Sequence, residues 1–489
     1  MSPLLIFLSF LAYTILVFLI TWVTARKADN DSFFIGNKHS PWPVVAYGMI
    51  GASLSGVTFM SVPGVVEATG FKYFGLVIGF VLGYVVIATV LLPLYYRLNL
   101  TSIYTYLEKR FGFWSYKTGA FFFLLSRTVI ASFRMFLVVN VLQFFVFNAW
   151  GVPFIVTVSI FILLILLYTF KGGIKTIIWT DALQTTFMLA AVVVALHLIC
   201  KEMGLSFGGL VQQVSHSKYS TLLEVDWHAR DFFLKQLLSG AFIAIAMTGL
   251  DQEMMQKNLS CRNLRDAQKN MFSFSIILVF VNLLFLFLGG ALFLFATQKG
   301  ITLPANTDDV FPVISINHLG PLAGLVFVIG LISAAYPSAD GALTSLTTTV
   351  SIDFIGLDKK ENLTELQKRR YRYLIHVSFA LLLLGMIVVF NAINDRAVID
   401  KLYTVVGYTY GPLLGLFSFG LFTKRRVRDK WVPWVALISP LMCYFLSEYS
   451  RQLFSGYTFG FELLIVNGAI SFLGMWLLSY PAKEKMLPF

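Results

Sequence analysis

Residues 325–349 read LVFVIGLISAAYPSADGALTSLTTT, an apolar run long enough to cross a bilayer that carries a proline and an aspartate. A second acid, Asp181, lies inside another such run, IIWTDALQTTFMLAAVVVA at 177–195. A charge in hydrocarbon is costly unless it meets a partner, a cation or water, so Asp340 and Asp181 mark a candidate functional site. Their Ser, Thr, Gly and Pro neighbours suit a cation held by oxygen atoms, as ion-coupled transport requires.

Composition places the chain among membrane proteins. Hydrophobic residues make up 57% of its 489 residues and charged residues 13%, where a soluble domain carries about 25% charged residues. The three cysteines and six histidines form no metal or disulfide pattern, and no Walker motif is present. The chain also lacks a His-based catalytic cluster and a nucleophile elbow, so an enzyme is not expected.

Hydropathy predicts an all-α polytopic membrane protein with about 13 transmembrane helices and no separate hydrophilic domain. The first segment has no cleavage site and is expected to be a retained helix. The predicted spans lie near 3–25, 43–69, 73–97, 116–147, 152–170, 174–200, 231–256, 268–297, 318–350, 371–393, 398–422, 431–449 and 459–480.

The distribution of Lys and Arg predicts the topology. Connections after odd-numbered spans are rich in these residues, including Lys257, Arg262, Lys269, KRRYR at 368–372 and KRRVRDK at 424–430. The rich side is expected to be cytoplasmic, with the N-terminus outside and the C-terminus inside. The net charge of +12 is divided among these short loops, so it does not indicate nucleic-acid binding.

The second span contains GMIGASLSGVTFMSVPG at 48–64. A helix so rich in Gly and hydroxyl residues can unwind in mid-membrane and offer its carbonyls to sodium. The same small residues also suit close helix packing. In the ninth span, Pro337 has no N–H to donate to the carbonyl of Ser333. The proline either produces a simple kink or frees that carbonyl for ion binding beside Asp340.

Two further groups leave alternatives open. Asp251, Gln252 and Glu253 lie near the end of the seventh span and either line a vestibule or cap the membrane boundary. Arg127 and Arg134 are seven residues apart on one face of the fourth span. Each either forms a structural salt bridge or clamps an anionic substrate.

Five segments in order resemble the sodium/solute symporter family, the group of sodium–glucose, proline and sialic acid cotransporters. The resemblance covers about residues 5–480. The segments are FFIGNKHSPWPV at 33–44, TSIYTYLEKRFG at 101–112, KGGIKTIIWTDALQ at 171–184, DQEMMQKNLSCRNLRDAQKNMF at 251–272 and YTYGPLLGLFSFGLF at 408–422.

The resemblance implies one transmembrane transporter domain over 1–489 with the leucine-transporter-type fold. Two inverted five-helix repeats would span 43–200 and 231–422, each beginning with a broken helix. An extra N-terminal helix would occupy 3–25, and two C-terminal helices would occupy 431–480.

The resemblance also implies sodium sites. The principal site would use carbonyls of Gly51 and Leu54 with Ala334, Pro337 and Ser338, although Pro337 replaces one of the family's hydroxyl residues. A second site would involve Asp181 and hydroxyls at positions that here hold Asp340 and Gly341. The two acids would then share a cation or one proton, because neighbouring carboxylates repel each other.

Substrate contacts implied by the resemblance match Ser53, Ser55 and Thr58. Arg134 lies at about the position where the sialic acid branch holds a carboxylate. The Gln and Asn of the sugar branch match Thr58 and Asp251, so the chain departs from the sugar pattern.

The sequence therefore predicts a sodium-coupled symporter in the plasma (inner) membrane. It would import a small polar solute by alternating access, with an anionic sugar such as sialic acid or another carboxylate as the leading candidate. It is expected to work as a monomer in the bilayer. The alternatives are proton coupling within the same fold and a membrane-embedded solute sensor.

Overall fold

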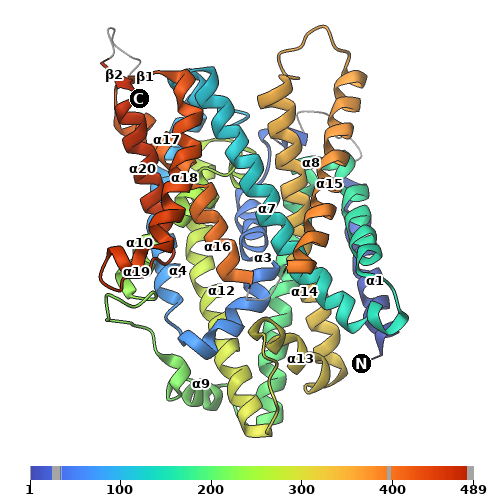
Figure 1. Cartoon of the computed structure of the whole chain (residues 1–489). Helices are drawn as coiled ribbons and strands as arrows, with labels where there is room; N and C mark the ends of the chain where they lie inside the picture. The colour runs from blue at the N-terminus through green and yellow to red at the C-terminus, as the bar shows by residue number, and fades with distance from the viewer. Residues whose placement is uncertain (1, 25–32, 35, 394–397, 482–489) are drawn as a thin grey trace.

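The chain forms a bundle of long helices, seen here in a computed structural model (Figure 1). The structure describes all residues except 1, 25–32, 35, 394–397 and 482–489. The two ends of the described chain lie at opposite ends of the bundle, as an odd number of crossings requires (Figure 1).

The predicted spans are present as helices. By length and hydropathy, nine described helices could cross a membrane, or up to 11 if two bent pairs each count as one span. Two shorter apolar helices, Phe154–Phe170 and Leu463–Leu477, match the remaining predicted spans.

The first half of the bundle contains the following elements: α1 (Pro3–Thr24), η1 (Gly36–Lys38), α3 (Trp42–Thr69), α4 (Phe74–Val86), η2 (Ile87–Leu91), α5 (Leu92–Arg97), α6 (Thr105–Arg110), α7 (Phe113–Phe145), η3 (Phe147–Trp150), α8 (Phe154–Met203), α9 (Phe207–Ser215) and η4 (Lys218–Ser220).

The second half contains α10 (Phe233–Ala244), η5 (Ile245–Gly249), α11 (Gln252–Leu259), α12 (Leu264–Lys299), η6 (Thr307–Asp309), α13 (Val310–Asn317), α14 (Gly320–Thr349), η7 (Val350–Ile355), α15 (Glu365–Ile393), α16 (Val398–Thr409), α17 (Gly411–Phe422), η8 (Asp429–Trp431), α18 (Val432–Glu448), α19 (Ser450–Leu453) and α20 (Leu463–Leu477). The short strands β1 (Arg426–Val427) and β2 (Ser479–Tyr480) pair antiparallel after α17 and α20.

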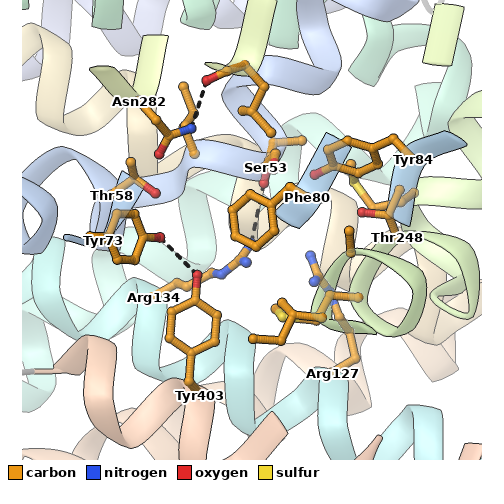
Figure 2. Close-up of a pocket in the computed structure, with 17 residues that line it drawn as sticks. Ser53, Thr58, Tyr73, Phe80, Tyr84, Arg127, Arg134, Thr248, Asn282 and Tyr403 are labelled. Atoms are coloured by element: carbon orange, nitrogen blue, oxygen red, sulfur yellow. Dashed lines mark hydrogen bonds between the residues drawn. The ribbon is translucent and has the colours of Figure 1, made fainter. Parts of the chain in front are cut away.

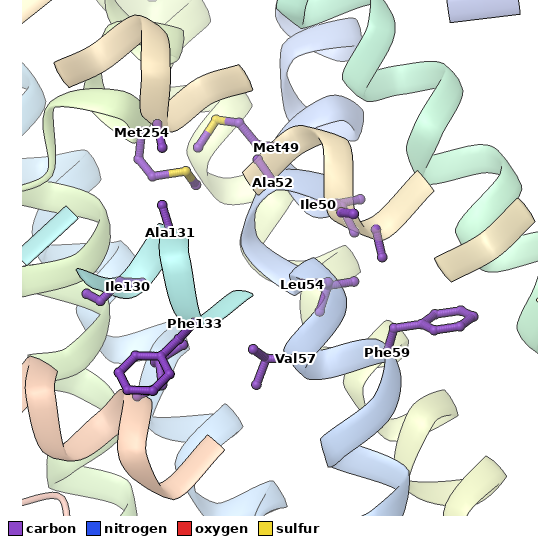
Figure 3. Close-up of a cluster of buried hydrophobic side chains, with 14 of the residues drawn as sticks. Met49, Ile50, Ala52, Leu54, Val57, Phe59, Ile130, Ala131, Phe133 and Met254 are labelled. Atoms are coloured by element: carbon purple, nitrogen blue, oxygen red, sulfur yellow. The ribbon is translucent and has the colours of Figure 1, made fainter. Parts of the chain in front are cut away.

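Helices α3, α7 and α14 form the centre of the bundle. About four fifths of the apolar window of each is buried, against 28% for α15 and 22% for the span that contains α18. The low values fit helices that face lipid. Apolar side chains of α3 and α7 belong to one buried cluster near the middle of α3, which also includes Met254 of α11 (Figure 3).

Small residues let these helices approach closely. A Cβ added at Gly48 or Gly51 would meet the side chains of Asp181 and Thr185 on α8, and one at Gly56 would meet Val138 on α7. Because lipid tails are as apolar as leucine, such close packing, rather than the hydrophobic effect, holds membrane helices together.

Helix α3 also breaks in the middle, so the predicted unwinding and the predicted close packing are both present. That the break binds sodium stays a prediction. Ser55 has φ 45° and ψ 174° inside an otherwise helical run. The second bent span lies at the predicted position, where α10–η5 and α11 meet at 66° around Leu250 and Asp251. In contrast, α14 keeps its helical course through Pro337.

The two spans within α8 are separated at Gly173, which has φ 51° and ψ −144°. A Cβ at this residue would overlap the backbone and ring of Phe33. This turn fixes the start of the helix that carries Asp181.

We expect Gly173→Ala to lower the melting temperature of the purified protein. The backbone conformation costs about 1–3 kcal/mol for a residue with a side chain, and the overlap with Phe33 adds to it. Gly204→Ala is the matched control, because Gly204 has φ 69° but nothing within 4 Å of the added Cβ. Equal losses in the two variants would contradict the role given to the contact with Phe33.

Candidate functional site

A cavity lies beside the break in α3, between α3, α4, α7, α10, α12 and α16 (Figure 2). It holds about 60 Å³ of free space. That is room for a few water molecules, so a solute the size of a sugar would require the surrounding helices to move apart. The lining residues that carry polar groups are Ser53, Thr58, Tyr73, Tyr84, Arg127, Arg134, Thr248, Asn282 and Tyr403.

Hydroxyl groups dominate this polar lining. The hydroxyls of Tyr73 on the α3–α4 connection and Tyr403 on α16 lie 3.1 Å apart (Figure 2). The amide nitrogen of Asn282 donates to the carbonyl of Leu278 at 2.8 Å within α12. Tyrosine and serine hydroxyls can both donate and accept, so the lining suits a solute with several polar groups.

Arg134 contributes a positive charge to the cavity. Its Nη1 donates to the carbonyl of Ala52, one turn before the break at Ser55, at 3.3 Å. Its Nε has no hydrogen-bond partner, and no acid of the described chain lies within 4 Å of the guanidinium. The side chain is 7% exposed. A guanidinium this buried is expected to have a charge partner, and the cavity is where that partner can come from.

Arg127 lies two turns earlier on α7 and is neutralised. It contacts the carboxylate of Glu253, and its Nη1 is 3.8 Å from Asp251. The salt-bridge alternative therefore holds for Arg127, whereas Arg134 forms no salt bridge with a described acid.

Lys257 links the acid that pairs with Arg127 to an acid on α8. Its Nζ lies 2.6 Å from Asp181 and 3.5 Å from Glu253, and all three side chains are buried. The assignment of Lys257 to a cytoplasmic loop was wrong, because the polar run after Asp251 is the half-helix α11 rather than a connection. The spacing of Glu253 and Lys257, four residues apart, is the sequence signal that could have revealed the pair.

We call the five side chains Asp181, Lys257, Glu253, Arg127 and Asp251 the ion chain. It connects α8, α11 and α7 through the centre of the bundle. Opposite charges alternate along it, which offsets the cost of removing each one from water.

Asp251, the last member, does not line the cavity. Its carboxylate caps α11 by accepting from the N–H groups of Glu253 and Met254 at 2.9 and 3.2 Å. It also accepts from the Tyr410 hydroxyl at 2.6 Å. Asp251 therefore neither lines a vestibule nor caps the membrane boundary. It is a buried helix cap at the break of the seventh span.

The residues named for cation binding lie on α3, α8 and α14, which pack against one another. The N–H of Gly51 donates to the Thr185 hydroxyl at 3.0 Å, and Leu54 reaches the cavity. Ser338 is fully buried, and its hydroxyl has no partner among the described residues. Ala334 and Pro337 lie in the same helix, also fully buried.

Asp340 is buried on α14 and accepts a hydrogen bond from the Tyr168 hydroxyl at 2.8 Å. It lies within electrostatic reach of both Asp181 and Lys257. The two acids therefore lie on helices that pack against each other, α8 and α14, and the Lys257 ammonium contacts Asp181.

The structure gathers Ser53, Thr58 and Arg134 at the cavity and leaves two other expected substrate residues outside its lining, Asp251 and Ser55. The tyrosines Tyr73, Tyr84 and Tyr403 were missed, because single aromatic residues in apolar helices give no signal that they face a cavity.

A family model for the sodium:solute symporter family matches residues 33–429. The sodium/sialic acid symporter NanT of Aliivibrio fischeri is 27% identical over 417 residues, which cover 82% of this chain and 79% of NanT. SiaT of Proteus mirabilis, also a sodium/sialic acid symporter, is 24% identical over 441 residues, covering 88% and 87%.

A solved structure of a substrate-bound, outward-open Na+-coupled sialic acid symporter superposes with a TM-score of 0.81. The two chains are 20% identical, and the match covers 97% of each. The likeness shows that the protein has the predicted leucine-transporter-type fold.

Removal of Glu253 should strongly destabilise the protein. Glu253→Gln leaves Arg127 with only its longer contact to Asp251 and Lys257 with Asp181 alone, and breaking such a buried pair costs about 3–5 kcal/mol. Glu202→Gln is the control, because Glu202 and Lys299 form an exposed pair at 3.5 Å that should contribute little. Thermal unfolding of both variants checks this, and similar shifts would mean that the ion chain is not a stabilising network.

Proposed function

Because the chain belongs to the sodium:solute symporter family, we propose that it imports an anionic, hydroxyl-bearing solute together with sodium. The protein is a sodium-coupled secondary transporter, not an enzyme. The proposal concerns its solute and the residues that bind solute and sodium. A sugar acid such as sialic acid is the leading candidate.

The observation that supports this proposal is the position of Arg134. Its guanidinium lines the cavity and, within the part of the chain that the structure describes, has a single carbonyl partner, so a carboxylate of the solute would satisfy both its charge and its free donors. The hydroxyls of Ser53, Thr58 and the tyrosines would bind the remaining polar groups of the solute. The names of NanT and SiaT agree with a solute of this chemistry.

For sodium, we propose the site formed by Gly51, Leu54, Ala334, Pro337 and Ser338. The break at Ser55 interrupts the helical hydrogen-bond ladder and frees carbonyls in the turn before it. The Ala52 carbonyl, which accepts from Arg134, belongs to the same turn. The unpartnered hydroxyl of Ser338 on the neighbouring helix adds a side-chain ligand.

This arrangement suggests how the two ligands are coupled. One turn of α3 would offer its carbonyls to sodium on one side and to Arg134 on the other. Sodium would then fix the turn and orient Arg134 for the solute, so that each ligand raises the affinity for the other. Alternating access would follow if the outward and inward states differ in their affinity for both.

The protein is a multi-pass integral membrane transporter. We propose the plasma (inner) membrane, with the N-terminus outside and the C-terminus in the cytoplasm, on the basis of the basic segments at 368–372, in the first turns of α15, and at 424–430. We further propose that one chain is sufficient for transport, because the cavity and the candidate sodium ligands all belong to a single bundle.

A thermal-shift screen of the purified protein tests the solute class. Sialic acids, other sugar acids, neutral sugars, monocarboxylates and amino acids are compared with and without sodium. A ligand that binds the folded protein raises its stability by mass action. We expect stabilisation by sugar acids that depends on sodium; stabilisation only by neutral compounds would contradict the proposal.

Arg134 and Arg127 should respond in opposite ways to the same change. Arg134→Met should abolish solute-induced stabilisation with little loss of intrinsic stability, because no acid is left unpaired. Arg127→Met should lower intrinsic stability by about 3–5 kcal/mol, because Asp251 loses its cation and Glu253 keeps only its longer contact to Lys257.

In the same assay, Arg134→Lys keeps the charge and loses the planar fork, so solute affinity should fall by about 1–3 kcal/mol. Full solute binding by Arg134→Met would exclude Arg134 from the solute site.

Ser338→Ala should weaken sodium binding with normal insertion into the membrane. Its hydroxyl has no partner to lose in the absence of sodium, so the melting temperature without sodium should stay near that of the wild type. Ser345→Ala is the control on the same helix, because the Ser345 hydroxyl already donates to the Ala342 carbonyl at 3.0 Å. An unchanged sodium half-saturation in Ser338→Ala would count against the site.

A further inference from the structure

We infer that Lys257 is a built-in cation that fills the cation position beside Asp181, so that each chain binds one sodium ion. This inference rests on the proposed function and deepens it, because it sets the ion stoichiometry. The sequence led us to expect that the two buried acids, Asp181 and Asp340, share a cation or a proton. The inference identifies the Lys257 ammonium as that cation.

Both oxygens of Asp181 are already engaged by groups of the chain itself. Oδ2 lies 2.6 Å from the Lys257 ammonium, at the short end of charge-assisted contacts. Oδ1 accepts from the Gln184 amide at 3.2 Å in the orientation that satisfies both ends of that amide. A sodium ion at Asp181 would have to displace one of these groups.

The charge around the ammonium also disfavours a second ion. Lys257 lies 3.5 Å from Glu253 and within electrostatic reach of Asp340. A sodium ion bound at Asp181 would lie next to this ammonium and would be repelled by it at close range.

The side chains available on α14 support the same conclusion. Asp340 directs one carboxylate oxygen to the Tyr168 hydroxyl. Gly341 offers no side-chain oxygen, and a Cβ there would overlap the Glu253 carboxylate. The space between α14 and α11 is therefore filled by the ion chain rather than left open for hydrated or partly ligated sodium.

A tethered cation differs from sodium in one consequential way. It cannot leave with the solute, so it adds no ion to the transport cycle. It instead ties Asp181 on α8 to the half-helix α11, next to the break at Leu250 and Asp251. The contact holds two helices together at a place where a dissociable ion would let them separate.

Equilibrium binding of radioactive sodium to the purified full-length protein, without solute, tests the inference. We expect one sodium ion per wild-type chain and two in Lys257→Met, where the vacated carboxylates can bind a second ion. Lys257→Arg, which keeps the charge, should bind one, as should the double variant Lys257→Met/Asp181→Asn, which removes both charges.

Two sodium ions per wild-type chain, or one in a folded Lys257→Met variant, would overturn the inference and leave the proposed function intact. No sodium binding by the wild type would instead refute the proposed function. If Lys257→Met does not fold, Ser338→Ala decides the question. Loss of all sodium binding in that variant supports a single site, and one remaining ion overturns the inference.

Discussion

A bundle surrounded by lipid cannot leave a charge in its centre without a partner, and this constraint organises the protein. The ion chain satisfies it by alternating acids and bases from Asp181 through Lys257, Glu253 and Arg127 to Asp251. Arg134 is the exception, since among the described residues its only hydrogen-bond partner is a backbone carbonyl. The same constraint supports the proposal that the cavity binds a solute with a negative charge, which would pair with Arg134.

The two broken spans place these groups. The break at Ser55 frees carbonyls of α3 beside both Arg134 and α14, and the break at Leu250 and Asp251 turns α11 so that Glu253 and Lys257 face inward. Close packing through glycines keeps the helices near enough for these contacts. The cavity, the proposed sodium site and the ion chain thus lie around two short stretches of irregular backbone, which a bilayer tolerates only where protein or a cavity surrounds them.

Sequence reasoning predicted the spans and the break in α3, because hydropathy and glycine content are local signals. The break in the seventh span was expected only from the family resemblance. Arg134 stood out as a charge inside a span, and its role in solute binding stays a prediction. Sequence reasoning misplaced Lys257, since a polar half-helix at the end of a span has the composition of a loop. It could not find the contact between Tyr410 and Asp251 or the pair of Tyr73 and Tyr403, which join residues 159 and 330 positions apart. Such contacts depend on how distant helices pack, and one sequence without homologues does not contain that information.

Uptake into proteoliposomes under imposed gradients tests sodium coupling to an anionic solute most directly. Radiolabelled sialic acid, or the sugar acid that stabilises the protein best, is supplied outside with an inward sodium gradient, or with an inward proton gradient in sodium-free buffer. The account predicts accumulation above the external concentration with sodium, and none with protons alone. Accumulation driven by the proton gradient without sodium, or uptake that ignores both gradients, would contradict it.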